Sequence, residues 1–380
     1  MKIVLVGPAY PLRGGIAQYL AVLYRKLQAA GHEVKFVSFI KQFPAWLFPG
    51  KSQTETSAEV INVQPTARFA PLGPRSWWRT YREIAKFNPQ LVVFKFWMPF
   101  FAPGYWAVSR WVRKRTGARV VYILDNVISH ERRAGDKLLT RLAFSQVDFF
   151  VAQSRAVERD LYTWFPETDR TRVAFAAHPT YDCYPPFAGT QTEARKVLGL
   201  PQDGKLLLFF GFVRHYKGLD LLLRALPQIR KQHPDARVVV AGEFYEPRKE
   251  FDALIRELQM EDAVFIHDDY CPNEKVGVYF AACDCVVLPY RSATQSGIIQ
   301  VAYALNAPVI TTDVGGLGEV VFEGVTGLVV PPESTDALAT AVDTFFARGG
   351  RAAFEAGIRQ EAHRFSWEGL VAAITGFGER

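Results

Sequence analysis

Residues 206–226 read LLLFFGFVRHYKGLDLLLRAL, and this stretch decides the class of fold. The apolar residues 206–210 form a continuous run without alternation, which is typical of a parallel strand covered on both faces. Gly211 allows the chain to turn, and Gly218 opens a second apolar series at helical spacing over 219–226. A buried strand followed directly by a helix is the repeating unit of doubly wound α/β folds.

The same pattern of a strand and then a helix recurs along the whole chain. Prolines and aromatic residues in HPTYDCYPPFAG (178–189) favour a linker, after which the pattern restarts. A chain of 380 residues is also long enough for about two domains. We therefore predict two doubly wound α/β domains facing each other, with ligands in the cleft at the carboxyl ends of the strands. The expected strands are 3–6, 34–39, 60–63, 91–96, 120–124, 149–152 and 173–176 in the first half, and 206–210, 238–241, 264–266, 285–289, 309–312 and 327–330 in the second.

The composition excludes several classes of protein. With 49% hydrophobic and 22% charged residues the chain is not of the disordered type. No apolar run reaches the roughly 18 residues that a membrane span needs, and MKIVLVG at the start predicts a buried strand rather than a signal peptide. The four cysteines lack the paired spacing of a zinc site, which favours buried thiols in a reducing cytoplasm. They are Cys183, Cys271, Cys283 and Cys285.

Charge is distributed unevenly between the two halves. Residues 1–185 carry a net charge of +13, whereas the remaining residues carry −6. An anionic substrate or surface bound by the first half would explain this excess. A solvated basic surface is the alternative interpretation.

Three junctions between a strand and a helix are candidate anion sites. In the first, Arg13, Gly14 and Gly15 precede a helix, so the backbone can approach a ligand closely and present free N–H groups. In the second, Arg214 and Lys217 follow a strand at a spacing of three residues. The forked guanidinium of an arginine and the compact ammonium of a lysine together suit two adjacent phosphates. The alternative for the first junction is a tight turn, and the alternative for the second is a basic loop at the surface.

The third junction lies in LPYRSATQSGIIQVAYALNAPVITTDVGGLGEVV (288–321). Ser296 and Gly297 begin an apolar helix, whose first amides can hold phosphate oxygens. A further strand ends before Gly315 and Gly316, and Glu319 follows. That carboxylate is a candidate for binding sugar hydroxyls, with a helix cap as the alternative.

Taken together, these stretches resemble the retaining nucleotide-sugar glycosyltransferases of the GT-B fold, family four (glycosyl transferases group 1). The resemblance covers nearly the whole chain. It implies an acceptor-side Rossmann-like domain at 1–180 completed by a C-terminal helix at about 366–380, a linker at 181–189, and a nucleotide-sugar domain at 190–365. It rests on the Gly-Gly loop near the start and on GFVRHYKGLDLLLRAL, AACDCVVLPY, ALNAPVITTDVGGLGEVV, GVTGLVVPPES and RFSWEGL, in that order.

The resemblance also implies roles for individual residues. Arg214 and Lys217 would neutralise the diphosphate leaving group as catalytic cations, beside Gly211. The amides of Ser296 and Gly297 would hold phosphate oxygens. Because charge developing on the leaving oxygen would then be stabilised by side chains and amides, we expect neither a metal nor any other cofactor.

The sequence departs from the family pattern at two places. The family usually has two glutamates separated by seven residues, which contact the donor sugar and the ribose, and Ala293 and Val301 stand there. We expect Thr294, Gln295 or Glu319 to supply these contacts.

A histidine of the family that often follows a strand near the donor sugar also has no direct counterpart. Asp125 stands at that place in DNVISHERR, with Asn126 beside it and His130 downstream. His130 and Asn126 are candidate catalytic residues, since a histidine can share a proton or orient a hydroxyl near neutral pH. A structural loop histidine and helix caps are the alternatives.

The expected function is transfer of a sugar from a nucleoside-diphosphate sugar to a hydroxyl of a glycan or lipid-linked acceptor. Aromatic and basic stretches such as SWWRTYREIAKF (76–87) predict contact with anionic lipid headgroups at the inner face of the cell membrane, with buried aromatics as the alternative. Two other functions fit the missing glutamates and the fold. They are a nucleotide-sugar epimerase or hydrolase, and a non-catalytic subunit that binds glycans or membranes. No nucleic-acid reader motif accompanies the charge.

Overall fold

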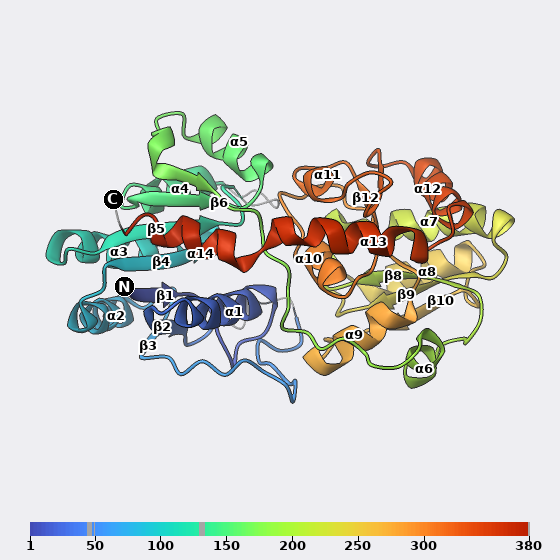
Figure 1. Cartoon of the computed structure of the whole chain (residues 1–380), viewed down its shortest axis with the longest axis horizontal. Coiled ribbons are helices and arrows are strands. Elements are labelled where there is room, and N and C mark those ends of the chain that lie inside the picture. The colour runs from blue at the N-terminus through green and yellow to red at the C-terminus, as the bar shows by residue number, and fades with distance from the viewer. Residues whose placement is uncertain (44–47, 49, 129–133, 379–380) are drawn as a thin grey trace. The chain divides into compact units, whose positions relative to one another are not determined.

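The computed structural model describes residues 1–43, 48, 50–128 and 134–378, and the chain forms two compact units (Figure 1). Unit 1 consists of Met1–Glu55, Val60–Pro179 and Ser366–Arg380. Unit 2 consists of Thr56–Glu59 and Thr180–Phe365. The chain therefore passes from unit 1 to unit 2 before Thr180 and returns after Phe365.

Unit 1 is built on a parallel sheet of seven strands in the order β3-β2-β1-β4-β5-β6-β7. Strand order reverses at β1, which pairs with both β2 and β4, so the edge beyond β1 and β4 is a topological switch point where ligands bind in such sheets. The strands are β1 (Lys2–Val6), β2 (Glu33–Phe39), β3 (Ala67–Phe69), β4 (Leu91–Phe96), β5 (Arg119–Leu124), β6 (Phe149–Ala152) and β7 (Val173–Phe175).

One expected strand of unit 1 is wrong. Residues 60–63 form no strand, and pairing with β2 begins only at Ala67. Of the residues 60–63 only Val63 is buried, because polar Asn62 and Gln64 interrupt the apolar run. Pro65, which has no N–H to donate, then delays pairing. The other runs predicted in this half coincide with strands.

Helices flank the sheet of unit 1 (Figure 1). The first, α1, buries Tyr19, Leu20, Leu23 and Leu27, whose spacing of three and four residues places them on one face. The last, α14, begins after Ser366, whose side chain caps it by accepting from the Gly369 N–H. The helices are α1 (Gly15–Ala29), α2 (Pro74–Phe87), α3 (Ala102–Arg115), α4 (Asp136–Phe144), α5 (Arg155–Trp164) and α14 (Trp367–Thr375), with short 3₁₀ turns at η2 (Pro99–Phe101) and η3 (Arg170–Arg172).

Unit 2 is built on a parallel sheet of six strands in the order β10-β9-β8-β11-β12-β13. Its switch point lies at β8, which pairs with both β9 and β11. All six strands fall on runs predicted from the sequence. They are β8 (Lys205–Phe210), β9 (Ala236–Ala241), β10 (Val264–His267), β11 (Cys285–Leu288), β12 (Val309–Thr312) and β13 (Gly327–Val330).

The helices of unit 2 cover both faces of this sheet. One of them, α7, begins within residues 206–226 and buries a leucine-rich face against the sheet. The helices are α6 (Gln191–Val197), α7 (Leu219–Gln232), α8 (Arg248–Glu257), α9 (Asn273–Ala282), α10 (Gly297–Ala304), α11 (Leu317–Val320), α12 (Thr335–Ala347) and α13 (Ala352–Glu361), with 3₁₀ turns at η4 (His215–Lys217) and η5 (Ala362–Phe365).

A short segment from the first half of the sequence belongs to unit 2. Thr56–Glu59 lies against the start of α9, where the Asn273 N–H donates to Ser57 Oγ and its side-chain amide donates to the Glu59 carbonyl, both at 2.8 Å. The domain boundary expected at residue 180 does not include this segment. Residues 181–189, expected as a linker, also group with unit 2.

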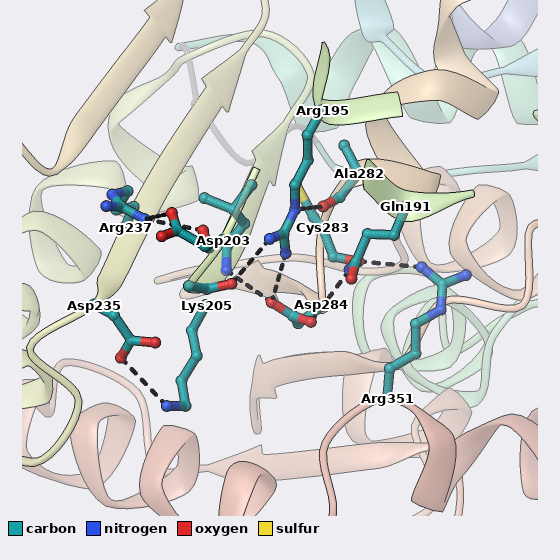
Figure 2. Close-up of polar contacts among 12 residues, drawn as sticks. Gln191, Arg195, Asp203, Lys205, Asp235, Arg237, Ala282, Cys283, Asp284 and Arg351 are labelled. Atoms are coloured by element: carbon teal, nitrogen blue, oxygen red, sulfur yellow. Dashed lines mark hydrogen bonds and ion pairs between the residues drawn. The ribbon is translucent and has the colours of Figure 1, made fainter. Parts of the chain in front are cut away.

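The amino ends of the unit 2 strands are held together by a buried ion pair (Figure 2). Arg195 of α6 donates to Asp284 Oδ2 at 3.3 Å and to the Ala282 carbonyl at 2.9 Å. The Asp284 carboxylate also accepts from the Leu206 N–H at 2.7 Å and from Gln191 at 3.2 Å. Every group in this cluster therefore has partners inside the fold.

Candidate functional site

The stretch that predicts the fold also forms the candidate site of unit 2. After β8 the chain turns at Gly211, whose φ of 96° lies in the region that favours glycine. A Cβ added to Gly211 would lie 3.2 Å from Lys217 Nζ. At Gly218, with φ of 68°, a Cβ would come within 2.1 Å of the Pro289 carbonyl oxygen, so no side chain fits. The two glycines thus bring η4 against the carboxyl ends of β8 and β11.

Lys217 carries a buried ammonium at this edge. The residue is 8% exposed, and no ion pair or hydrogen bond reaches its Nζ from any residue that the structure describes. Burial, reinforced by the charge of Arg214, lowers the pKa of Lys217 to about 7. A buried cation without a counter-ion is costly, so an anion that enters here is bound with the full attraction of the unpaired charge.

Arg214 lies on an aromatic surface next to Lys217. Its guanidinium Cζ is 4.8 Å from the centroid of the Tyr245 ring, and Phe212 stacks on the same ring at 4.6 Å. Tyr270 stacks on Phe212 at 6.3 Å. The structure thus places a second cation and half-buried aromatic rings at the ends of β8, β9 and β10.

An ion pair fixes the turn that presents Lys217. Arg291 donates to both oxygens of Asp220, at 2.8 and 2.7 Å, and to the His215 carbonyl at 2.9 Å. Burial opposes ionisation of Asp220, but the hydrogen bonds and charge of Arg291 hold the pKa of that carboxyl below its usual value. Because Asp220 opens α7 and Arg291 follows β11, this bidentate pair ties the two elements that flank Lys217.

The predicted phosphate-binding helix α10 begins nearby in the same unit. Ser296 is its N-cap residue, and Gly297 is its first residue. Thr294 and Ser296 are buried, whereas Gln295 is partly buried. The first N–H groups of a helix have no partner within that helix, so α10 presents amides at the carboxyl edge of the sheet.

The two positions where the family has glutamates are apolar and inside the fold. Ala293 is 6% exposed and Val301 is 4% exposed. The Ala293 carbonyl lies so close to Gly315 that a Cβ there would be 1.5 Å from its oxygen. Glu319 lies in the single-turn helix α11, in the loop that follows β12. The structure thus brings Thr294, Gln295 and Glu319 to the ends of β11 and β12.

In unit 1, the predicted Gly-Gly loop lies at the end of β1. Gly14, with φ of 110°, is the N-cap residue of α1, and Gly15 is its first residue. Arg13 is 8% exposed, and its guanidinium Cζ lies 5.9 Å from the centroid of the Phe48 ring. The Gln53 carbonyl accepts from the Arg13 N–H at 3.0 Å, which fixes the loop backbone.

A polar cluster at the carboxyl ends of β4, β5 and β6 in unit 1 was not predicted from the sequence, although one of its members, Asp125, was noted there. Lys95 Nζ lies 2.6 Å from Asp125 Oδ1 and 3.6 Å from the centroid of the Tyr19 ring. Gln153 accepts from Lys95 and donates to the Tyr19 hydroxyl at 2.7 Å. His178 packs edge-on against Tyr19 at 5.1 Å. A lysine inside the apolar run LVVFKF was the signal that could have found this cluster.

The two catalytic candidates of this unit differ in what can be said of them. Asn126 follows Asp125 and donates its side-chain amide to the Trp97 carbonyl at 3.3 Å, which orients it at the end of β5. His130 lies outside the described residues. Both roles remain predictions.

Two family models match the chain. One, described as a glycosyl transferase 4-like domain, matches residues 14–175. The other, described as glycosyl transferases group 1, matches residues 204–348. The first match falls in the half that contains the Lys95 cluster, and the second contains the Lys217 site.

Two curated proteins of similar sequence carry the same activity in their names. A D-inositol 3-phosphate glycosyltransferase of Acidothermus cellulolyticus is 30% identical over 305 residues, which cover 74% of this chain and 66% of the relative. The protein of the same name from Xylanimonas cellulosilytica is 30% identical over 234 residues, 60% of this chain and 55% of the relative. The matches therefore span between 55 and 66% of these relatives' lengths.

Solved structures share the fold over nearly the whole chain. HepE of Anabaena, crystallised with UDP, has a TM-score of 0.76 at 16% identity, and the match covers 99% of each chain. Sucrose-phosphate synthase from Thermosynechococcus elongatus has a TM-score of 0.74 at 19% identity, covering 100% of this chain and 98% of that one. The predicted fold of two Rossmann-like units of the GT-B type is confirmed.

Proposed function

The chain belongs to the group 1 glycosyl transferases, and on that premise we propose that it transfers a sugar from a nucleoside-diphosphate sugar to a hydroxyl group. One observation carries this proposal: the ammonium of Lys217 is buried at the carboxyl edge of the unit 2 sheet without a counter-ion in the described part of the chain. A diphosphate is the anion that this group, Arg214 and the amides of α10 together fit.

The proposed reaction breaks the bond between the anomeric carbon and the diphosphate oxygen. The bonding electron pair leaves with the diphosphate, and the acceptor oxygen forms the new bond to the anomeric carbon. The acceptor proton passes to the departing phosphate oxygen, which places attack and departure on one face of the sugar and retains its configuration. Lys217 and Arg214 stabilise the negative charge as it develops, with no metal in the proposed mechanism.

The aromatic rings beside Arg214 support a nucleotide as the donor's leaving group. Half-buried Phe212, Tyr245 and Tyr270 offer ring faces to a flat base. HepE of Anabaena, which shares the fold, was crystallised with UDP and with UDP-glucose. We therefore propose a uridine diphosphate sugar as the first donor to test.

The acceptor side of the proposal rests on unit 1. The curated relatives are named for a D-inositol 3-phosphate acceptor, and unit 1 carries the basic excess of the chain. We propose a hydroxyl of a glycan or of a lipid-linked acceptor.

We further propose that unit 1 approaches an anionic membrane, at the inner face of the cell membrane, through one face of α2 and α3. Trp78 is 38% exposed, stacks edge-on with Trp111 at 5.1 Å, and lies 5.3 Å from the Arg115 guanidinium. Exposed Arg79 and Arg82 follow on α2. This combination of a tryptophan and cations suits a lipid headgroup region. None of the helices in the described residues has the length and hydropathy that a bilayer crossing requires.

A thermal-shift screen of UDP, GDP, ADP and dTDP sugars tests the donor proposal. A ligand at about 100 times its Kd stabilises the native state by about 2.7 kcal/mol, which is a clear shift. A rise in melting temperature with one class of nucleotide sugar, followed by release of that nucleotide when a sugar acceptor is added, supports a transferase. Consumption of the donor without a transfer product supports an epimerase or hydrolase instead. The absence of any shift supports a non-catalytic subunit.

A further inference from the structure

The Lys95 cluster of unit 1 buries a charge where an apolar side chain would fill the same space. Lys95 is 1% exposed and lies on β4, next to the switch point of the sheet. Replacing a buried ion pair by apolar residues is often neutral or stabilising. Stability of the fold alone therefore does not explain the buried pair of Lys95 and Asp125.

Three elements hold the lysine in one position. The carbonyl oxygen of Gln153, which follows β6, accepts from its ammonium, and the Tyr19 ring of α1 lies 3.6 Å below it. Gln153 and Tyr19 are themselves joined by a hydrogen bond of 2.7 Å. The Trp367 ring packs against the Tyr19 ring, with centroids 5.2 Å apart. The ammonium therefore has little freedom to move.

Asp125 is the exposed end of this arrangement. Its side chain is 13% exposed, and its backbone N–H donates to the Phe96 carbonyl at 2.9 Å, which places it directly beyond β5. A carboxylate accepts hydrogen bonds only, so its natural ligand is a hydroxyl or an N–H group. Ligands of parallel sheets bind at this edge.

The histidine of the cluster does not compete with Lys95 for Asp125. Burial, with the charge of Lys95 as the second cause, lowers the pKa of His178 to about 3, so its imidazole is neutral. Burial also lowers the pKa of Lys95, and the Asp125 carboxylate opposes that change. Among the residues that the structure describes, the cluster thus contains one cation and one carboxylate.

We propose that Lys95 is a positioning residue, which holds the Asp125 carboxylate where it accepts a hydrogen bond from a hydroxyl of a bound sugar. This inference rests on the proposed glycosyl transfer and names residues outside the Lys217 site. Lys95 does not touch the substrate, whereas Asp125 does.

Three variants separate positioning from stability: Lys95→Met, Asp125→Asn and the double variant. Each single substitution removes one charge of a buried ion pair and lowers the melting temperature, while the double variant recovers much of that loss. We expect UDP release from UDP-glucose to fall about 100-fold in all three, since a misplaced carboxylate cannot orient the sugar. UDP alone, which has no sugar, binds each variant as it binds the wild type.

Arg195→Met is the matched control. Arg195 and Asp284 form a pair of similar burial, with side chains 4% and 19% exposed, at the amino ends of the strands in unit 2. This variant loses stability while its turnover per folded molecule stays at the wild-type level. For the Lys95 and Asp125 variants, a change in the affinity for UDP-glucose relative to that for UDP assigns the hydroxyl bound by Asp125 to the donor sugar. A fall in turnover without such a change assigns it to the acceptor.

Two results would overturn the inference in distinguishable ways. A folded double variant that keeps wild-type turnover shows that the pair is structural, and the proposed function survives. Wild-type protein that binds no nucleoside diphosphate and releases none from any sugar nucleotide removes the proposed function and this inference with it.

Discussion

Two buried lysines lie at the carboxyl edges of the two sheets, and they differ in what surrounds them. Lys95 in unit 1 is paired with Asp125 at 2.6 Å, so its charge is compensated within the protein. Lys217 in unit 2 has no such partner among the residues that the structure describes, and Arg214, whose charge helps to lower its pKa, has the same sign. A compensated cation can hold another side chain in place, whereas an uncompensated one is suited to bind an anion.

The largest expected effect is that of Lys217→Met. Loss of one charged group that stabilises a leaving oxygen lowers turnover by about 1,000-fold, or about 4 kcal/mol. The same substitution removes an uncompensated buried charge, so the ligand-free protein gains thermal stability. The pKa of Lys217 is lower in the folded state than in the unfolded state. The free-energy cost of burying its charge is therefore complete below pH 7 and shrinks as the pH rises toward 10.5. The gain in stability on replacing Lys217 is accordingly larger at pH 6 than at pH 9.

Lys205→Met serves as the control for that experiment, because Lys205 starts β8 and pairs with Asp235 at 3.3 Å near the surface. Turnover and melting temperature of this variant should stay close to wild type. An Lys217→Met variant that is less stable than wild type and fully active would contradict the assignment.

The second effect concerns the compensated pair at the other edge of unit 2. Arg195→Met leaves Asp284 buried without its cation and should cost about 3 kcal/mol in the free energy of unfolding, measured with urea. UDP affinity should not change, since Arg195 lies at the amino ends of the strands (Figure 2). A matching loss of UDP affinity in fully folded protein would show that the two edges are coupled.

The fold was predictable from the sequence because its strands are continuous apolar runs, such as LLLFF before Gly211. Arg214 and Lys217 were predictable because a glycine turn followed by cations stands out from its neighbours. The Lys95 cluster as a whole was not, since its members lie far apart in the sequence, with 134 positions between Tyr19 and Gln153. The parallel register of β4, β5 and β6 brings Lys95, Asp125 and Gln153 together, and α1 adds Tyr19. At 60–63 the error is the reverse, since a strand was predicted where none forms. The prediction relied on two valines and an isoleucine and gave too little weight to Asn62 and Pro65.

The third effect distinguishes the basic excess of unit 1 from the site of unit 2. Arg79→Ala combined with Arg82→Ala should weaken binding to vesicles that contain phosphatidylserine by about 30-fold, at about 1 kcal/mol per cation. Arg224→Ala combined with Lys231→Ala, on α7 of unit 2, should leave vesicle binding unchanged in the same flotation assay. Equal losses in both pairs would favour general charge over a defined face.

The smallest effect tests how rigidly Lys217 is presented. Asp220→Asn removes the charge that Arg291 binds with two hydrogen bonds and should weaken UDP binding about tenfold, or about 1.4 kcal/mol. Asp262→Asn is matched to it, because Asp262 accepts the same fork from Arg230 at 2.9 and 3.0 Å. Calorimetric titration with UDP should separate the two variants, and identical affinities would remove the role given to Arg291.

The most direct measurement is the number of protons taken up when UDP binds at pH 8, from calorimetry in buffers of different ionisation enthalpy. Since the pKa of Lys217 is about 7 without ligand, this amine is mostly neutral at pH 8 and must be protonated to face a diphosphate. The account predicts uptake of nearly one proton by the wild type and none by a Lys217→Arg variant that still binds UDP, whose guanidinium is already charged. No proton uptake by the wild type, or the same uptake in both proteins, would contradict it.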